Sequence, residues 1–208
     1  RMNAYPAPIG LAYIAGYLDP DRHDVKILDL MFSEDYLEET GRTVREFQPD
    51  LIGISLRNLD NVSYMDPQWA LPGTKEVIDK IRSITEAPIV CGGPGFSLLP
   101  EACFDYLGLD LGVAGDGGES FAQLADAMES GETYHNMPGL VYRDDTGSIV
   151  RKGLAYSEFS KPPLLDQLDM ARYEKAGFGI GVVTKLGNAF SNSIIAENDT
   201  AAWRVLRP

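Results

Sequence analysis

Short apolar runs alternate with amphipathic stretches along the first 130 residues. Four runs have the length and the β-branched content of strands, and they predict strands at Val25–Leu30, Leu51–Leu56, Pro88–Cys91 and Leu111–Ala114. The stretches around them predict helices at Ile9–Leu18, Leu37–Phe47, Thr74–Ile84, Pro100–Tyr106 and Glu119–Glu129. This alternation is typical of βαβ units, so the expected fold is α/β, with a doubly wound (flavodoxin-like or Rossmann-like), mainly parallel sheet.

The helix boundaries are predicted from local signals. Pro8 precedes the first helix, and Thr74 is placed to cap the third helix at its N-terminus. In the last of these helices the apolar residues recur at i, i+3, i+4 and i+7, at Phe121, Leu124, Ala125 and Met128.

The pattern changes after Gly131. Two short runs, 140–143 and 148–152, predict a hairpin, and a proline-containing linker covers 161–165. From residue 177 no sustained period is present. The expected organisation is therefore an α/β domain over 1–131, a hairpin and linker over 132–160, and an irregular tail over 161–208.

The start of the chain lacks an expected element. The first strand of a doubly wound sheet is central, yet no apolar strand precedes Pro6. Either the true N-terminus has been lost, or another segment takes the position of that strand. Gly179–Thr184 is the spare apolar run with strand character, so we hypothesise that it substitutes.

Composition narrows the class of protein. A formal net charge of -13, with no basic stripe, argues against nucleic acid as a partner. The longest apolar run, Ile9–Leu18, is too short to cross a bilayer, and no signal-peptide pattern precedes it. Cys91 and Cys103 are too few for a disulfide framework and are expected to be reduced and buried, which favours a cytoplasmic protein.

Candidate chemistry gathers where parallel strands end, because ligands of open α/β sheets bind beyond the carboxyl ends of the strands. Ser55–Asn61, Gly92–Phe96 and Gly115–Glu119 are expected to meet there. A single glycine pair is more often a tight turn without a ligand, but three such segments on one edge favour a site. The loop 57–73 is unusually long, and Tyr64 and Trp69 offer flat contact surfaces.

Several stretches together resemble the cobalamin-binding domain of B12-dependent radical S-adenosylmethionine (SAM) proteins. They are APIGLAYIAGYL at 7–18, PDLIGISLRNLDN at 49–61, IVCGGPGFS at 89–97 and GDGGE at 115–119, with PGLVYR at 138–143 similar to the hairpin that follows. The resemblance covers about residues 5–145, and it is specific as a set although each piece is weak alone.

The resemblance implies cobalamin as the ligand. It implies that Ser55 is the serine of the strand-end motif and that Gly92 and Gly93 line the buried nucleotide tail. We expect valine at either glycine to block this groove and to leave the fold intact. The expected cofactor-binding residues are Ser55, Leu56, Arg57, Asn58, Asp60, Asn61, Gly92, Gly93, Gly95, Phe96, Gly115, Gly117 and Glu119. Asp116 and Glu119 are expected to act as helix caps and ligand contacts rather than as a general acid or base.

Two departures from the family pattern qualify this expectation. The Asp-x-His-x-x-Gly segment that supplies an axial histidine in many cobalamin proteins is absent, and His23 and His135 lie elsewhere, so we expect cobalt without a histidine ligand. Residues 184–195 resemble the start of a radical SAM barrel, whose three cysteines bind a [4Fe-4S] cluster. Here those positions are Asn188, Asn192 and Ile195, and 208 residues leave no length for a barrel.

We therefore expect a cobalamin-binding module with no catalytic residues of its own, which does not cleave SAM and which works with a separate radical SAM barrel or another protein. Two alternatives remain at this point. One is a flavodoxin-like domain that binds FMN, although the first loop lacks the serines and threonines that usually hold a flavin phosphate. The other is a protein-interaction remnant that has kept the fold and lost the ligand.

Overall fold

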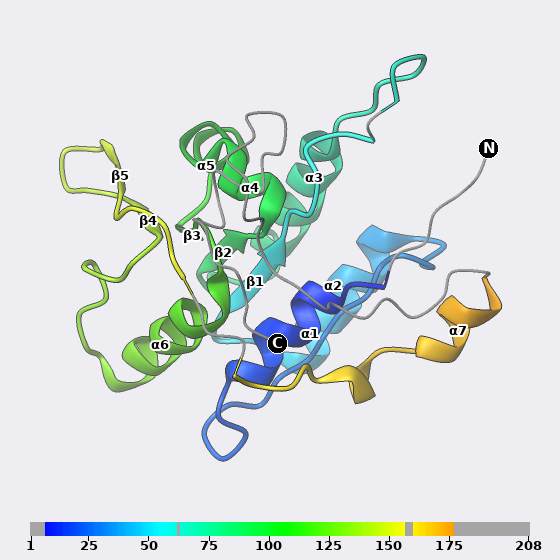
Figure 1. Ribbon diagram of the computed structural model, residues 1–208, viewed down its shortest axis with the longest axis horizontal. Coiled ribbons are helices and arrows are strands. Elements are labelled where there is room, and N and C mark those ends of the chain that lie inside the picture. The colour runs from blue at the N-terminus through cyan, green and yellow to red at the C-terminus, as the bar shows by residue number, and fades with distance from the viewer. Residues whose placement is uncertain (1–6, 62, 157–159, 177–208) are drawn as a thin grey trace.

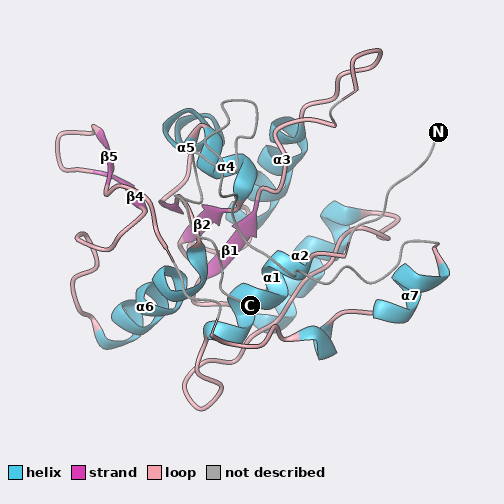
Figure 2. Ribbon diagram, viewed as in Figure 1, coloured by secondary structure: helices cyan, strands magenta, loops and turns pink. Residues whose placement is uncertain are grey.

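The computed structural model describes residues 7–61, 63–156 and 160–176. Their centre is a five-stranded sheet with helices on both faces (Figures 1 and 2). The strands lie side by side in chain order: β1 (Ile52–Ser55), β2 (Ile89–Gly92), β3 (Leu111–Val113), β4 (Leu140–Arg143) and β5 (Ile149–Arg151). The first three are parallel and the hairpin β4–β5 is antiparallel. The predicted fold class is confirmed, and the hairpin extends the same sheet.

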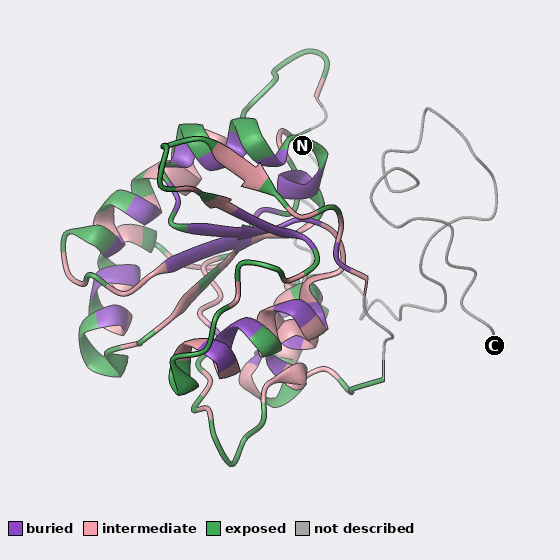
Figure 3. Ribbon diagram, turned by 90° about the vertical axis from the view of Figure 1, so that its left-hand side faces the viewer, coloured by how far each residue is buried: buried purple, intermediate pink, exposed green. Residues whose placement is uncertain are grey.

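Two layers of helices cover the sheet (Figure 3). On one face α1 (Ile9–Tyr17) packs against α6 (Gly117–Ser130). On the other face α2 (Tyr36–Phe47) packs against α3 (Ala70–Arg82), which contacts α5 (Pro100–Leu107). A short helix, α4 (Pro94–Leu98), follows β2. The crossover helices run back from the carboxyl ends of the strands, as a parallel sheet requires.

Alternation along the strands divides the core between the two faces. Ile89 and Cys91 of β2 lie in the cluster beneath α3 and α5, whereas Val90 packs with Leu111 and Val113 beneath α6. Helix α6 contributes Leu124 to this second cluster. Both faces of the central strands are therefore buried, which explains why these strands are continuous apolar runs.

Helix α3 begins four residues earlier than the sequence predicts. Thr74 is not its cap, because the hydroxyl of Thr74 donates a hydrogen bond to the carbonyl of Ala70 within the helix, at 2.9 Å. Pro72 lies in the first turn, where its missing N–H would have no intrahelical partner. The proline therefore marks the start of the helix rather than the end of the preceding loop.

The predicted strand at Val25–Leu30 is wrong. The backbone of this segment pairs with one side chain: Gln167 Oε1 accepts from the N–H of Ile27 at 2.7 Å, and Gln167 Nε2 donates to the carbonyl of Val25 at 2.6 Å. A strand needs a neighbour, and no described segment pairs with β1 on its outer edge. The Gly179–Thr184 hypothesis lies outside the described residues.

The part of the tail that the structure describes packs against the N-terminal region. It forms a short 3-10 turn, η1 (Leu165–Gln167), and helix α7 (Met170–Lys175), neither of which the sequence predicted. The N–H of Leu164 donates to the carbonyl of Ala12 at 2.8 Å, and the buried Tyr173 donates its hydroxyl to Asp29 Oδ2 at 2.6 Å. A cavity of about 530 Å³ lies between Lys26–Asp29, α2 and the start of α7.

None of the helices in the described ranges is long and apolar enough to cross a membrane.

Candidate cofactor site at the carboxyl edge of the sheet

The three segments that the sequence singles out do meet at the carboxyl edge. The N–H of Gly95 donates to the carbonyl of Leu56 at 2.9 Å, which joins the turn after β2 to the end of β1. The hydroxyl of Ser97 donates to the carbonyl of Gly93 and accepts from the N–H of Gly115, both at 2.9 Å. One backbone hydrogen bond and the Ser97 hydroxyl thus join the segments after β1, β2 and β3 into one edge.

A strip of small residues crosses this edge on the face toward α6. The register of β1 and β2 pairs Gly53 with Val90 and Ser55 with Gly92, so the side chains of these pairs point to one face. Gly53 and Ser55 are exposed although they belong to the sheet, and Gly92 is half-buried. The ring of Phe121 lies over the strip at Gly53, and Ser55 is exposed nearer the carboxyl end of β1. A flat or slender ligand can therefore approach the backbone closely here.

Gly53 is a residue of this strip that the sequence reasoning missed. A Cβ added to Gly53 would lie 3.2 Å from the ring of Phe121, so a larger side chain would fill the space between β1 and α6. The signal was present in the order Ile52, Gly53, Ile54, Ser55, because period-two alternation places the two small residues on one face and the two isoleucines on the other.

Two of the predicted site glycines are required by the chain itself. Gly93 has φ +96°, and a Cβ there would lie 2.8 Å from the carbonyl oxygen of Leu56. Gly115 has φ +100°, and its Cβ would lie 2.3 Å from the carbonyl oxygen of Ala155. The expectation that valine at Gly93 leaves the fold intact is therefore wrong. At Gly92 the nearest atom to an added Cβ is the carbonyl oxygen of Val113, at 3.2 Å.

Three predicted contacts are buried inside the protein. Leu56 is 3% exposed and Phe96 is fully buried, and both belong to the core beneath α3 and α5. The Phe96 ring packs so closely on β3 that a Cβ at Gly112 would lie 2.4 Å from it. Gly95 is buried as well. These residues shape the edge from below, and only their backbone could reach a ligand.

The loop after β1 holds its own shape and projects from the body of the molecule (Figure 1). Asn61 organises it: Nδ2 donates to the carbonyl of Asp66 at 2.9 Å, and Oδ1 accepts from the N–H groups of Ser63 and Gln68. Asp60 forms a β-bridge with Trp69. Tyr64 is 98% exposed and Trp69 62% exposed, so the loop presents flat aromatic surfaces. At its base Arg57 and Asn58 are exposed.

Helix α6 begins at the same edge, directly after β3. Asp116 occupies its N-cap position without a side-chain capping hydrogen bond, so the capping role predicted for Asp116 is wrong. Glu119 lies half-buried in the first turn. Gly117 and Gly118 open the helix without side chains, and Cβ atoms there would meet Ile14 at 3.4 Å and the ring of Tyr17 at 2.7 Å. Glycine thus lets α1 pack against the start of α6.

Both histidines of the chain lie away from this edge. His23 contacts Asp126 on the last turns of α6, and His135 stacks on Tyr134 and meets Tyr142, which pairs with the start of β3. The two cysteines are free and buried, as predicted. Burial raises the pKa of Cys91 to about 12 and also raises the pKa of Cys103, so both thiols stay protonated and unreactive at neutral pH.

The family is settled by comparison with known proteins. Residues 3–125 match the model of the B12 binding domain. The chain belongs to the B12-binding domain family. It is a B12-binding module homologous to B12-dependent radical SAM enzymes, which confirms the resemblance found in the sequence.

Individual relatives agree with this assignment. The chain is 33% identical over 166 residues to a tryptophan 2-C-methyltransferase of Streptomyces laurentii, and it is 26% identical to a cytidylyl-2-hydroxyethylphosphonate methyltransferase of Streptomyces wedmorensis. Among solved structures it resembles the radical SAM methyltransferase TsrM of Kitasatospora setae with cobalamin and a [4Fe-4S] cluster bound, with a TM-score of 0.81, 27% identity and 96% of this chain covered. OxsB, at 19% identity and a TM-score of 0.72, shares the fold.

These relatives are much longer than this chain. The matched part is 26% of the Streptomyces laurentii methyltransferase, 28% of the Streptomyces wedmorensis protein and 40% of the TsrM chain. The positions Asn188, Asn192 and Ile195 lie outside the described residues, so the expected loss of the iron-sulfur ligands stays a prediction.

Proposed function

We propose that the chain binds cobalamin across the carboxyl edge of the sheet, with its nucleotide tail over the strip Gly53, Ser55 and Gly92. The observation that carries this proposal is the exposure of Gly53 and Ser55 in β1, next to β2 and β3, whose residues are buried or half-buried. Small side chains in register leave a shallow bed at the place where doubly wound sheets bind nucleotide-like ligands.

The groups around this bed suit a corrinoid. The N-terminal end of α6 carries a partial positive charge, which favours an anion, and the phosphate of the nucleotide tail is one. Arg57 and Asn58 are exposed beside the strand end and can donate hydrogen bonds to the amide side chains of a corrin. The loop with Tyr64 and Trp69 offers apolar surface to the ring itself.

The chain offers no histidine to the cobalt. Because His23 and His135 lie elsewhere, we expect wild-type protein and a His23→Gln, His135→Gln double variant to give the same corrinoid spectrum. A spectral change in the double variant would refute this expectation. Bound cobalamin would supply a cobalt centre that carries a methyl group, as the names of the methyltransferase relatives suggest.

We propose that the module presents its cofactor to a radical SAM barrel. In this division residues 1–131 hold the cofactor, 132–160 extend the sheet, and 161–208 are a tail that resembles the degenerate start of a barrel. The packing of Leu164 on α1 supports it, since this contact holds the start of the tail against the module. Without cysteines at residues 188, 192 and 195, we expect iron and sulfide reconstitution to leave no [4Fe-4S] absorbance, and a stable cluster would overturn that expectation.

The direct test is a visible spectrum of the purified protein after incubation with hydroxocobalamin and removal of free ligand. We expect about one equivalent of corrinoid to stay bound, because one edge of the sheet carries one bed. FMN is tested in parallel. A colourless protein after both ligands would reject the proposal in favour of a ligand-free interaction domain, and retained FMN alone would favour a flavin-binding module.

A further inference from the structure

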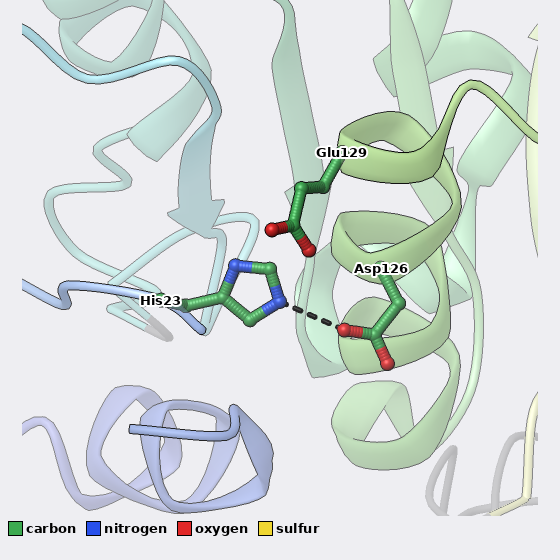
Figure 4. A group of neighbouring side chains, drawn as sticks. All are labelled: His23, Asp126 and Glu129. Atoms are coloured by element: carbon green, nitrogen blue, oxygen red, sulfur yellow. Dashed lines mark hydrogen bonds and ion pairs between the residues drawn. The ribbon is translucent and has the colours of Figure 1, made fainter. Parts of the chain in front are cut away.

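A second group of chemically capable side chains lies at the far end of α6. His23, from the turn after α1, meets Asp126 and Glu129 of α6 (Figure 4). Asp126 and Glu129 are three residues apart and so project from one side of the helix. Helix α6 starts at the carboxyl edge and ends on the opposite side of the sheet, which separates this cluster from the proposed corrinoid bed.

The three side chains present metal-binding atoms to a common point. His23 Nε2 lies 2.8 Å from Asp126 Oδ1, and one atom of each of the three residues lies within 4.8 Å of the others. The His23 side chain is only 16% exposed, so its ring is held in this orientation. Imidazole nitrogen with two carboxylates is a ligand set that zinc and its neighbours in the first transition row accept.

The electrostatics of the helix end also favour a cation. The last turn of α6 contains no basic residue, and the C-terminal end of a helix carries a partial negative charge. Asp126 and Glu129 add two carboxylates there. Arg22 supplies the balancing charge in this structure: Nη1 lies 2.7 Å from Asp126 Oδ1, and Nε lies 3.0 Å from Glu129 Oε2.

Arg22 is a replaceable cation. Its side chain is 40% exposed, whereas the side chain of His23 is 16% exposed. A metal ion could displace the guanidinium into water and keep the same two carboxylates. The ligand atoms would then close to zinc-binding distances through side-chain rotation, with solvent completing the coordination.

We propose that His23, Asp126 and Glu129 form a site for a divalent transition metal, for which zinc is the probe, and that Arg22 competes with the metal for the two carboxylates. The ion would tie the turn of residues 19–24 to α6. The proposal is independent of corrinoid binding, because it involves none of the residues of the carboxyl edge and can be tested without cobalamin.

The test is calorimetric titration of tag-free, chelator-treated protein with zinc chloride. We expect about one equivalent to bind, with at least about tenfold weaker binding in His23→Gln, since even outer-shell changes at metal sites cost about 10- to 100-fold. His135→Gln is the matched control, because His135 is exposed and stacks between two tyrosines. Zinc that binds equally well to both variants would overturn the proposal, as would wild-type protein that binds none.

Arg22→Gln tests directly whether Arg22 competes with the metal for the two carboxylates. A metal that competes with Arg22 should bind about two- to fivefold more tightly once the guanidinium is gone, which corresponds to the usual strength of exposed ion pairs. Unchanged or weaker binding in Arg22→Gln would refute the competition. If His23→Gln does not fold, as judged by circular dichroism, Glu129→Gln takes its place, with the same loss expected.

Discussion

The two edges of the sheet are built from different kinds of residue. At the amino edge the charges are paired: Arg82 donates to the carbonyl of Gly108 and to Asp110 Oδ2, and Asp110 Oδ2 also accepts from the N–H of Ile89 at 3.0 Å. At the carboxyl edge one backbone hydrogen bond and the Ser97 hydroxyl join the turns, and Gly53 and Ser55 of β1 stay exposed. Charged side chains hold the first edge together, whereas the second edge keeps small, exposed residues where we propose that the ligand binds.

The largest difference between the two edges is expected in corrinoid affinity when Ser55 is substituted. Ser55→Leu places a branched side chain on the exposed bed over β1, where it contacts no core residue in the free protein but overlaps the proposed position of the nucleotide tail. We expect corrinoid affinity to fall by about tenfold or more, because forcing extra methylenes into an occupied space costs about 1–3 kcal/mol. The measurement is corrinoid retained after desalting, with the unfolding midpoint unchanged.

The matched control for Ser55→Leu is Ser83→Leu. Ser83 is also exposed, but it caps the C-terminal end of α3 on the amino side of the sheet. We expect this variant to bind corrinoid like the wild type. If both variants bind equally well, the ligand does not occupy the bed over β1, and the proposed site is wrong.

The next effect concerns stability and tests why the carboxyl edge needs glycine. Gly93 has φ +96° and ψ 171°, a conformation that is almost confined to glycine, and a Cβ would also lie against the carbonyl oxygen of Leu56. We expect Gly93→Ala to lower the free energy of unfolding by about 3 kcal/mol or more. Gly131, with φ +72° and nothing within 4 Å of an added Cβ, should lose only about 1 kcal/mol on substitution by alanine.

Urea unfolding of the two glycine variants measures this difference. A larger loss at Gly93 reports its backbone conformation and its close approach to Leu56 together. Equal losses would contradict the expectation that the turn after β2 needs glycine more than the end of α6 does.

Asp110→Ala should lower the stability of the fold and leave corrinoid affinity unchanged, whereas Ser55→Leu should do the opposite. Removal of this carboxylate leaves the part-buried N–H of Ile89 without its acceptor, whereas Arg82 keeps its hydrogen bond to the carbonyl of Gly108. An unsatisfied buried donor costs about 1–3 kcal/mol, so we expect a loss in that range with corrinoid affinity unchanged per folded molecule. A variant that keeps its stability but loses corrinoid would contradict the division between the edges.

The sequence predicted correctly those elements whose local hydrophobic pattern matches the burial and pairing that the fold gives them. β2 and β3, buried on both faces, were found within one residue at each end, and α6 was found with its apolar stripe. Val25–Leu30 carries the same strand pattern but lies in no ladder, because pairing depends on a neighbour that the pattern of one segment cannot reveal. The joining of the hairpin to β3 was missed for the same reason.

The sequence predicted part of the candidate site correctly and part of it wrongly, for a similar reason. Strand-end position could be read from the sequence, so Ser55 and Gly92 were placed correctly at the edge. Side-chain direction could not be read as easily, which is why Leu56 and Phe96 were assigned to the ligand although both lie in the core. Gly53 was overlooked because its meaning depends on its partner in β2 and on Phe121 above it.

The smallest expected effect tests whether the loop after β1 takes part in the carboxyl edge. Asn61→Ala removes three hydrogen bonds that hold the loop, and their exposure makes each one weak. We expect chymotrypsin to cut faster at the exposed Tyr64 and corrinoid affinity to fall by about two- to fivefold, whereas Asn136→Ala, in the exposed loop before β4, should change neither. Faster cutting with unchanged affinity would show that the loop stands clear of the ligand. In that case the bed over β1 would supply the binding energy, and the aromatic surfaces of Tyr64 and Trp69 would be left for another partner.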